Sequence, residues 1–306
     1  MSLGEAKGLR AASRQHVAVM VEEVVGLVRA SNPLVVVDTT VGTGGHSEAL
    51  LEATGARLIG LDRDAEALRA AAERLARFGS RVTLHQADFA GIAELLEQEG
   101  SPLVGAIVAD LGMSSFALDD PARGFSFMLE GPLDMRMDQR QTLRAYDLVN
   151  EESEEELARI IHEYGEDRES RRIARAIVAA RRRAPLETTG ELRAVIEAAV
   201  GGRRQGGVNP ATRTFQALRI AVNHEMASLE QFLAEAPRRL AAGGRLVVLA
   251  YHSLEDRQVK RRFRELSASA EFSLITRRAQ RPSEGEVARN RRARSARLRC
   301  LERTAN

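Results

Sequence analysis

The sequence contains few of the residues that build covalent or metal-bound scaffolds. It has one cysteine, Cys300, and six scattered histidines without ligand spacing. A single thiol excludes a disulfide framework and a thiolate metal cluster, so we expect no metal site. No apolar run approaches the ~20 residues that span a bilayer, and the segment 1–15 lacks the apolar core of a secretory signal. We therefore expect a cytoplasmic protein with no membrane partner.

Lysine is nearly missing as well, and arginine takes its place. Only Lys7 and Lys260 are lysines among 45 basic residues. The formal net charge is +2, but the tail from Arg257 to Asn306 carries 15 basic and 5 acidic residues, a local charge of +10 that leaves −8 for the preceding 256 residues. Because guanidinium groups fork onto phosphates and stack on bases, this tail predicts a polyanionic partner. For any one arginine, a solvated surface is the alternative.

Length and composition set the class of protein. A chain of 306 residues is expected to form one large domain or about two ordinary ones. Its content of 44% hydrophobic and 29% charged residues is typical of a globular protein with enough apolar side chains for a real core.

The segment from Val35 to Asp62 carries the strongest local signal. A short apolar run is followed by a loop with Gly42, Gly44 and Gly45, a helical pattern, and a second apolar run that ends in Asp62. This order of strand, glycine turn, helix, strand and acid predicts a nucleotide site at the carboxyl edge of a parallel sheet. Asp62 lies 20 residues after Gly42, where a carboxylate can accept both ribose hydroxyls.

The electrostatics of this loop favour one nucleotide cofactor over another. The dinucleotide fingerprint would need a glycine where Ser47 stands. Asp38, the acid that ends the first apolar run, suits a cationic ligand better than a pyrophosphate. S-adenosylmethionine carries an amino group and a sulfonium, so we favour it over NAD. An ordinary glycine turn that binds nothing is the alternative.

Further along the chain, strands and helices alternate until a long interruption. Helical spacing of apolar residues predicts helices over Arg63–Phe78 and Ile92–Gln98. The further segments that we expect to form strands are Arg81–Phe89, Val104–Leu111, Gly243–His252, Phe272–Thr276 and Ala296–Leu301. The order predicts an α/β protein with a Rossmann-like core and an insertion after the fourth strand.

The interruption is polar and its pattern is helical. Capping boxes pair Ser153 with Glu156 and Thr188 with Glu191, each just before an apolar pattern of helical spacing. We therefore expect a discontinuous core formed by residues 1–120 and 209–306, and an inserted all-helical domain over residues 121–208 that recognises the substrate.

Arginines are also concentrated in the inserted segment. Those at the three- and four-residue spacing of one helix face are Arg168, Arg171, Arg172 and Arg175. Contact with RNA and pairing with nearby glutamates on a solvated helix explain them equally well. Gly201–Gly207 is expected to be a flexible basic loop.

Six motifs are too long and specific to be generic. They are DTTVGTGGHS at 38–47, LDRD at 61–64, DLGMSS at 110–115, RGFSFMLEGPLDMRMD at 123–138, NPATRTFQALRIAVNHE at 209–225 and YHSLEDRQVKRRF at 251–263. Together they resemble the RsmH (MraW) family of bacterial 16S ribosomal RNA cytosine-N4 methyltransferases. The resemblance implies a class I S-adenosylmethionine-dependent methyltransferase core, and a target cytosine near the decoding centre (the P-site region) of 16S rRNA within the small ribosomal subunit.

The resemblance also implies the cofactor contacts. Carried over position by position, they are Gly44, Gly45, His46, Asp62, Phe89 and Asp110. The loop backbone would face the methionine moiety, Asp62 would bind the ribose and Phe89 would cover the adenine. Plain core packing of Phe89 and capping of a helix by His46 are the alternatives.

Three departures from the family pattern stand out. Ala117 replaces a glutamine that is a further cofactor contact in the family. The segment 290–295 has Asn-Arg-Arg-Ala-Arg-Ser where the family tends toward Asn-Pro-Arg-Ala-Arg-Ser, and the first motif is His16-Val17-Ala18-Val19 in place of His-x-Pro-Val. None of the three removes a carboxylate.

The chemistry predicts the catalytic groups. The lone pair of a cytosine N4 amine is delocalised into the ring, so an acceptor must hold an amine proton during attack on the methyl group. We expect Asp110 nearest the methyl group, with Asp134 or His252 completing the site. The base must leave its stack to reach the donor, and the nearby aromatic residues that could grip it are Phe116, Phe125 and Phe127.

Two other functions are compatible with the sequence. One is a non-catalytic RNA-binding or ribosome-assembly factor that kept the fold, although the intact Asp62, Asp110 and glycine loop argue against it. The other is a methyltransferase that acts on protein or DNA. The sequence leaves open whether naked rRNA or an assembled subunit is recognised, and whether the protein is a homodimer.

Overall fold

The computed structural model describes residues 18–113, 115–201 and 209–305. The chain divides into two compact units. The first unit contains the residues up to Asp62, residues 66–112 and the residues from Leu233 onward, and the second contains residues 63–65 and 113–232.

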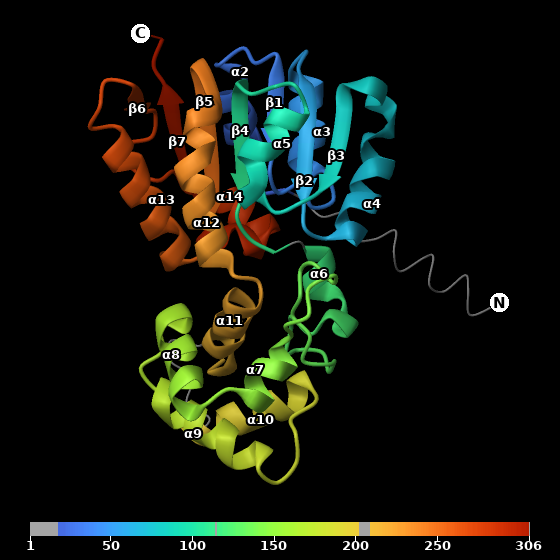
Figure 1. Cartoon of the computed structure of the whole chain (residues 1–306), viewed down its shortest axis with the longest axis vertical. Helices are drawn as coiled ribbons and strands as arrows, with labels where there is room; N and C mark the ends of the chain where they lie inside the picture. The colour runs from blue at the N-terminus through green and yellow to red at the C-terminus, as the bar shows by residue number, and fades with distance from the viewer. Residues whose placement is uncertain (1–17, 114, 202–208, 306) are drawn as a thin grey trace, which may run out of the picture. The chain divides into compact units, whose positions relative to one another are not determined.

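The first unit is built on a seven-stranded sheet with the order β3-β2-β1-β4-β5-β7-β6 (Figure 1). The strands are β1 (Val35–Asp38), β2 (Arg57–Asp62), β3 (Val82–Gln86), β4 (Val104–Asp110), β5 (Leu240–Ala250), β6 (Phe272–Leu274) and β7 (Arg297–Arg303). The pairs among β1 to β5 are parallel, and β7 is antiparallel to both of its neighbours. The expected Rossmann-like α/β core is therefore confirmed.

Helices cover the sheet, which explains why its central strands are apolar on both faces. The helices of the first unit are α2 (Val21–Arg29), α3 (Gly45–Ala53), α4 (Ala65–Leu75), α5 (Ile92–Gln98), α13 (Ser253–Leu266) and α14 (Glu284–Arg289). One core cluster joins Val28 of α2 and Leu50 of α3 to Val36 of β1, Val247 of β5 and Cys300 of β7. Burial raises the pKa of the Cys300 thiol to about 12.

Two element ends differ from the sequence expectation for local reasons. The helix expected over Arg63–Phe78 begins at Ala65 and ends at Leu75, where a 3-10 turn with Gly79 at φ +56° follows. The strand expected over Arg81–Phe89 ends at Gln86. It stops there because the Asp88 carboxylate accepts a hydrogen bond from the backbone N–H of Ala90 (2.9 Å) and starts a new turn.

The second unit is helical, with a core of its own. Its helices are α6 (Ser115–Asp119), α7 (Ala145–Glu151), α8 (Glu154–Gly165), α9 (Ser170–Arg181), α10 (Thr189–Val200) and α11 (Ala211–Val222). The two expected helix starts are confirmed, because Ser153 accepts from the N–H of Glu156 and Thr188 forms a complete capping box with Glu191.

The second unit is longer than the expected insertion over residues 121–208. Phe215 and Leu218 of α11 lie in the same core cluster as Leu157 and Ile161 of α8. The chain therefore remains in the second unit through α11, and the boundary at Phe232 falls inside α12 (Glu225–Glu235). The basic loop expected at 201–207 lies outside the described residues after Gly201.

The expected arginine face is shorter than the sequence suggested. Arg168 precedes α9, which begins at Ser170, so only Arg171, Arg172 and Arg175 share that helix. Within the described ranges, no helix of either unit has the length and apolar character needed to cross a membrane.

Asp256 joins α13 to β7 through the basic tail. It accepts from Arg297 and from Arg299, each at 2.8 Å, and the side chains of Asp256 and Arg299 are 10% exposed. Burial acts to raise the pKa of Asp256, but the bonds from Arg299 and Arg297 outweigh it and the pKa is lowered. Arg297 and Arg299 therefore stabilise the packing of β7 against α13.

Asp256→Asn is expected to destabilise the protein by about 3 kcal/mol at neutral pH, because it leaves Arg299 buried without its charged partner. The folded pKa of Asp256 is depressed, so its contribution is present above the unfolded pKa near 4 and is lost as pH falls through the folded value. Urea unfolding of both proteins at pH 7 and at decreasing pH measures the difference. If the difference in unfolding free energy between wild type and Asp256→Asn does not become smaller at acidic pH, the ion-pair explanation is contradicted.

Candidate active site

The glycine loop after β1 and the acid after β2 are brought together as expected. Gly42 and Gly44 have left-handed backbone angles, φ +54° and +85°, which glycine adopts without a side-chain clash. The N–H of Gly42 donates to Oδ2 of Asp62 over 2.7 Å. Gly45 then begins α3. The loop and the acid of the predicted cofactor site are thus one connected structure.

Asp38 ends β1 just before this loop, and its carboxylate is bonded within the protein; the expectation that it favours a cationic ligand stays a prediction. The residue is 1% exposed. Ser47 Oγ donates to its carboxylate over 2.6 Å and the N–H of Thr40 over 3.2 Å. Burial raises the pKa of Asp38, and the bond from Ser47 opposes the rise. Its structural effect is to tie the start of α3 to the end of β1.

Asp110, at the end of β4, is held by groups from three other segments. Its backbone N–H donates to Thr40 Oγ1 (2.6 Å), which follows β1. The hydroxyl of Tyr251, the residue after β5, donates to Asp110 Oδ1 over 2.6 Å. Nδ1 of His46, in α3, lies 3.5 Å from Asp110 Oδ2. The carboxylate predicted to lie nearest the methyl group therefore has a fixed orientation.

His46 uses both ring nitrogens for contacts inside the first unit. The side chain is buried, and Nε2 lies 2.8 Å from the carbonyl oxygen of Val19. Because a carbonyl only accepts, Nε2 is the nitrogen that carries a hydrogen. With Nδ1 turned toward Asp110, the ring joins the segment before α2 to the end of β4. The alternative that His46 caps α3 is not supported, since its ring contacts lie elsewhere.

Phe89 follows β3 and begins a short 3-10 turn, where it is half-buried. A half-buried ring after the third strand is compatible both with covering an adenine and with packing. The predicted contacts with the cofactor all remain predictions, namely those of Gly44, Gly45, His46, Asp62, Phe89 and Asp110.

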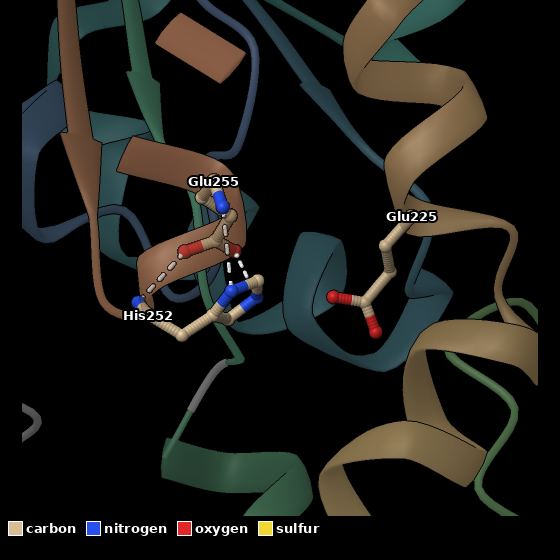
Figure 2. A group of neighbouring side chains, drawn as sticks. All are labelled: Glu225, His252 and Glu255. Atoms are coloured by element: carbon tan, nitrogen blue, oxygen red, sulfur yellow. Dashed lines mark hydrogen bonds and ion pairs between the residues drawn. The ribbon is translucent and has the colours of Figure 1, made fainter. Parts of the chain in front are cut away.

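His252 is the N-cap residue of α13, and it forms a capping box with Glu255 (Figure 2). Its Nδ1 accepts from the N–H of Glu255 at 3.4 Å, while Glu255 Oε2 accepts from the N–H groups of His252 (3.2 Å) and Tyr251 (2.8 Å). Nε2 lies 3.1 Å from Glu255 Oε1 without hydrogen-bond geometry. This reciprocal cap gives His252 a clear structural task, and its catalytic role remains a prediction.

Asp134 belongs to the second unit, where its carboxylate is paired with Arg136. The guanidinium Nε is 3.0 Å from Oδ1, and Nη2 is 2.7 Å from Oδ2. The carbonyl oxygen of Asp134 also accepts from the N–H of Ala145 (2.8 Å). The local structure thus explains Asp134 as the partner of Arg136, and its catalytic role also stays a prediction.

The aromatic candidates of the second unit are largely core residues. Phe125 is 6% exposed, and Phe127 packs edge-to-face on Phe215 with ring centroids 5.1 Å apart. The side chain of Phe116 lies outside the described residues. Ala117 is 2% exposed in the same apolar cluster, so it contributes packing where the family has a glutamine.

Tyr251 and Thr40 are the site residues that reasoning from the sequence missed. Both contact Asp110, and both lie within the quoted motifs. Their positions in the sequence could have revealed them. Thr40 follows β1 and Tyr251 follows β5, and these are the two strands that neighbour β4 in the sheet.

The sheet order, with β7 antiparallel and the glycine loop after β1, defines a class I S-adenosylmethionine-dependent methyltransferase. The model of the MraW methylase family matches residues 13–304, so the chain belongs to this family. The expected family, fold and cofactor, S-adenosylmethionine, are confirmed.

Two relatives with high sequence identity give the same picture. A ribosomal RNA small subunit methyltransferase H from Sorangium cellulosum is 49% identical over 294 residues, which cover 96% of this chain and 92% of that protein. A protein of the same name from Syntrophobacter fumaroxidans is 47% identical over 306 residues, covering 94% and 96% of the two chains. The crystal structure of an rRNA methylase from Streptococcus thermophilus is 11% identical, with a TM-score of 0.43 over 95% of this chain and 99% of that one.

Asp62→Ala is expected to weaken S-adenosylmethionine binding. The change removes the proposed ribose acceptor and also the partner of the Gly42 N–H. Hydrogen bonds to charged groups are worth about 1.5–3 kcal/mol, so the Kd should rise roughly ten- to hundredfold. Calorimetry measures the Kd, and circular dichroism checks the fold. Glu52→Ala, which removes an exposed acid of α3, is the matched control. Equal affinity of Asp62→Ala and wild type would refute the assignment.

Proposed function

We propose that this protein transfers a methyl group from S-adenosylmethionine to the N4 amine of a cytosine in the decoding centre of 16S rRNA. Family membership and relatives of 44–50% identity named ribosomal RNA small subunit methyltransferase H support rRNA methylation. The N4 amine and the position in the rRNA rest on the motif resemblance. The observation that carries the chemistry is the Asp110 carboxylate, which Tyr251 holds at the end of β4, at the same edge of the sheet where Asp62 binds the glycine loop.

The residues at this edge of the sheet fit the cofactor. Gly42 leaves open space beside the loop, since a Cβ added there would meet no atom within 4 Å, whereas a Cβ added at Gly44 would lie 3.5 Å from Ala71 and Leu75. Gly44 and Gly45 would face the methionine moiety, Asp62 would accept from the ribose, and Phe89 would cover the adenine. S-adenosylmethionine, when bound, supplies an electrophilic methyl group.

The task of the protein is then to orient the amine and to receive its proton. The amine is a poor nucleophile because its lone pair is delocalised, so its reactivity rises when an acceptor holds one N4–H. Asp110 is the proposed acceptor, because general-base geometry requires a carboxylate at hydrogen-bond distance from the proton. A preorganised carboxylate needs little rearrangement during the reaction.

The arginines of the basic tail fall into two groups with different roles. Arg297 and Arg299 are bound to Asp256 and are structural. Arg291, Arg292 and Arg294 lie in a 3-10 turn that is anchored by the buried Ala293, and all three are exposed. We propose that this exposed turn contacts RNA phosphates.

The second unit is proposed to recognise the substrate, and its basic surface is partly compensated by acids. Arg136, Arg140 and Arg144 line a hollow of about 710 Å³ that also contains Gln139 and Thr142. Each of the three guanidiniums forks onto an aspartate, namely Asp134, Asp138 and Asp147 respectively. Fixed guanidinium planes suit stacking on unpaired bases more than binding of phosphate charge. This surface therefore complements the tail turn.

Methylation is tested with small ribosomal subunits and naked 16S rRNA, each incubated with the protein and S-adenosylmethionine. Mass spectrometry of the digested nucleosides should show N4-methylcytidine, and Asp110→Asn should show little or none. Methylation at another atom or base would reject the finer proposal while keeping an rRNA methyltransferase. Absence of S-adenosylmethionine binding would favour the non-catalytic RNA-binding factor, and methylation of protein or DNA alone would favour another substrate class.

Replacing Arg291, Arg292 and Arg294 with alanine should lower RNA affinity and weaken its dependence on salt. Each lost phosphate contact removes about one unit from the slope of log K against log salt concentration, so the slope should flatten by up to ~3 units. S-adenosylmethionine affinity should be unchanged, because the tail turn is not part of the glycine loop. RNA affinity measured over a range of salt concentrations gives the slope.

A second triple variant controls for loss of charge alone. Arg69, Arg77 and Arg238 have exposed side chains outside the tail. Their replacement by alanine removes the same formal charge and should leave the slope nearly unchanged. Equal slopes for wild type and the tail variant, or equal flattening in both variants, would reject docking through the tail turn.

A further inference from the structure

The side chain of Tyr251 lies closer to the Asp110 carboxylate than that of His46, and the family resemblance does not give Tyr251 a role. Its hydroxyl donates to Asp110 Oδ1 at 2.6 Å, a length typical of a charge-assisted bond from O–H to a carboxylate. Burial, followed by the charge of Asp110, raises the pKa of the Tyr251 phenol well above its usual value. The phenol therefore remains a hydrogen-bond donor throughout the neutral range.

The backbone and the neighbouring strand hold this phenol in place. Asp110 pairs with Leu249 in the parallel register of β4 and β5, so Tyr251 follows directly beyond the paired residues. The N–H of Tyr251 donates to Oε2 of the buried Glu255 (2.8 Å). A Cβ added at Gly112 would lie 2.9 Å from Cδ2 of the Tyr251 ring, so a larger residue at this position would force the ring to move.

The two oxygens of the Asp110 carboxylate are not equivalent. Oδ1 accepts the short bond from Tyr251. Oδ2 has a longer approach from His46 Nδ1, at 3.5 Å, and among the described residues it accepts no hydrogen bond. Because a bond from a hydroxyl withdraws electron density from Oδ1, the more basic lone pairs lie on Oδ2.

We propose that Tyr251 is a positioning residue for methyl transfer: it fixes Asp110 so that Oδ2 receives the amine proton. This inference rests on the proposed function of Asp110 as the acceptor. As the N–C bond to the methyl group forms, the S–C bond breaks and its electron pair stays on sulfur. The N4 proton passes to Oδ2, and the Tyr251 proton remains on its own oxygen. Tyr251 contributes orientation and gives up no proton.

Tyr251→Phe removes the hydroxyl and keeps the ring against Gly112. With small ribosomal subunits as substrate, the kcat of this variant should fall about ten- to hundredfold relative to the wild-type enzyme. This is the loss expected for one hydrogen bond to a charged group. KM for the subunit and the Kd for S-adenosylmethionine should each change less than about threefold, because Tyr251 contacts the acceptor and not the ligands. Tyr146→Phe, the same change in the second unit, should leave all three values unaltered.

Gly112→Ala tests the same bond without removing the hydroxyl. The added methyl group should displace the Tyr251 ring and lower kcat in wild type. In the Tyr251→Phe background it should lower kcat little further, because the bond is already lost. A purely structural role would instead give additive losses, together with a lower melting temperature.

The outcomes separate this proposal from the function it rests on. If Asp110→Asn keeps wild-type kcat, Asp110 is not the acceptor and both ideas fail. If Asp110→Asn is inactive while Tyr251→Phe keeps wild-type kcat, the positioning role alone is overturned. The chain has no tryptophan, so alkaline titration of tyrosinate absorbance reads the phenols directly. In wild type, the phenol of Tyr251 should stay protonated above pH 10, and Tyr251→Phe should remove this late-ionising phenol from the titration curve.

Discussion

Three carboxylates end neighbouring parallel strands, and the geometry of the site depends on keeping each in its own hydrogen-bonding environment. Asp62, Asp38 and Asp110 end β2, β1 and β4, which are adjacent in the sheet. The charge of Asp110 is one of the causes that raise the pKa of Asp38, after burial. The fold gives each acid separate donors: the Gly42 N–H for Asp62, a serine and a backbone N–H for Asp38, and a phenol for Asp110. Two of these four donors, the N–H groups of Gly42 and Thr40, come from the loop that follows β1.

Much of this architecture could be predicted from the sequence, because parallel strands and their turns are encoded locally. The seven strands, the glycine turn and the two capped helices follow from apolar patterning and from residues with special backbone preferences. The role of Asp38 could not be predicted, since the sequence does not show on which side of the loop an acid points. Tyr251 was missed for a related reason: its partner Asp110 is 141 positions away along the chain.

The net charge of the basic tail does not show which of its arginines are structural and which are exposed. Arg297 and Arg299 alternate along β7 with the buried Leu298 and Cys300, so both arginines point to the face that Asp256 occupies. Arg291, Arg292 and Arg294 lie in a turn where Ala293 is the buried residue. Their formal charges are identical, and the local backbone decides which arginines stabilise the core and which are exposed at the surface.

The burial of Cys300 has a practical consequence for spectroscopy. The thiolate is the reactive form of cysteine, and here the thiol is fully buried with its pKa raised to about 12. Maleimide and iodoacetamide reagents should therefore leave the folded protein unlabelled at neutral pH. Since the sequence has no other cysteine, one introduced at an exposed position would carry a single fluorophore or spin label. The native core residue would not have to be replaced first.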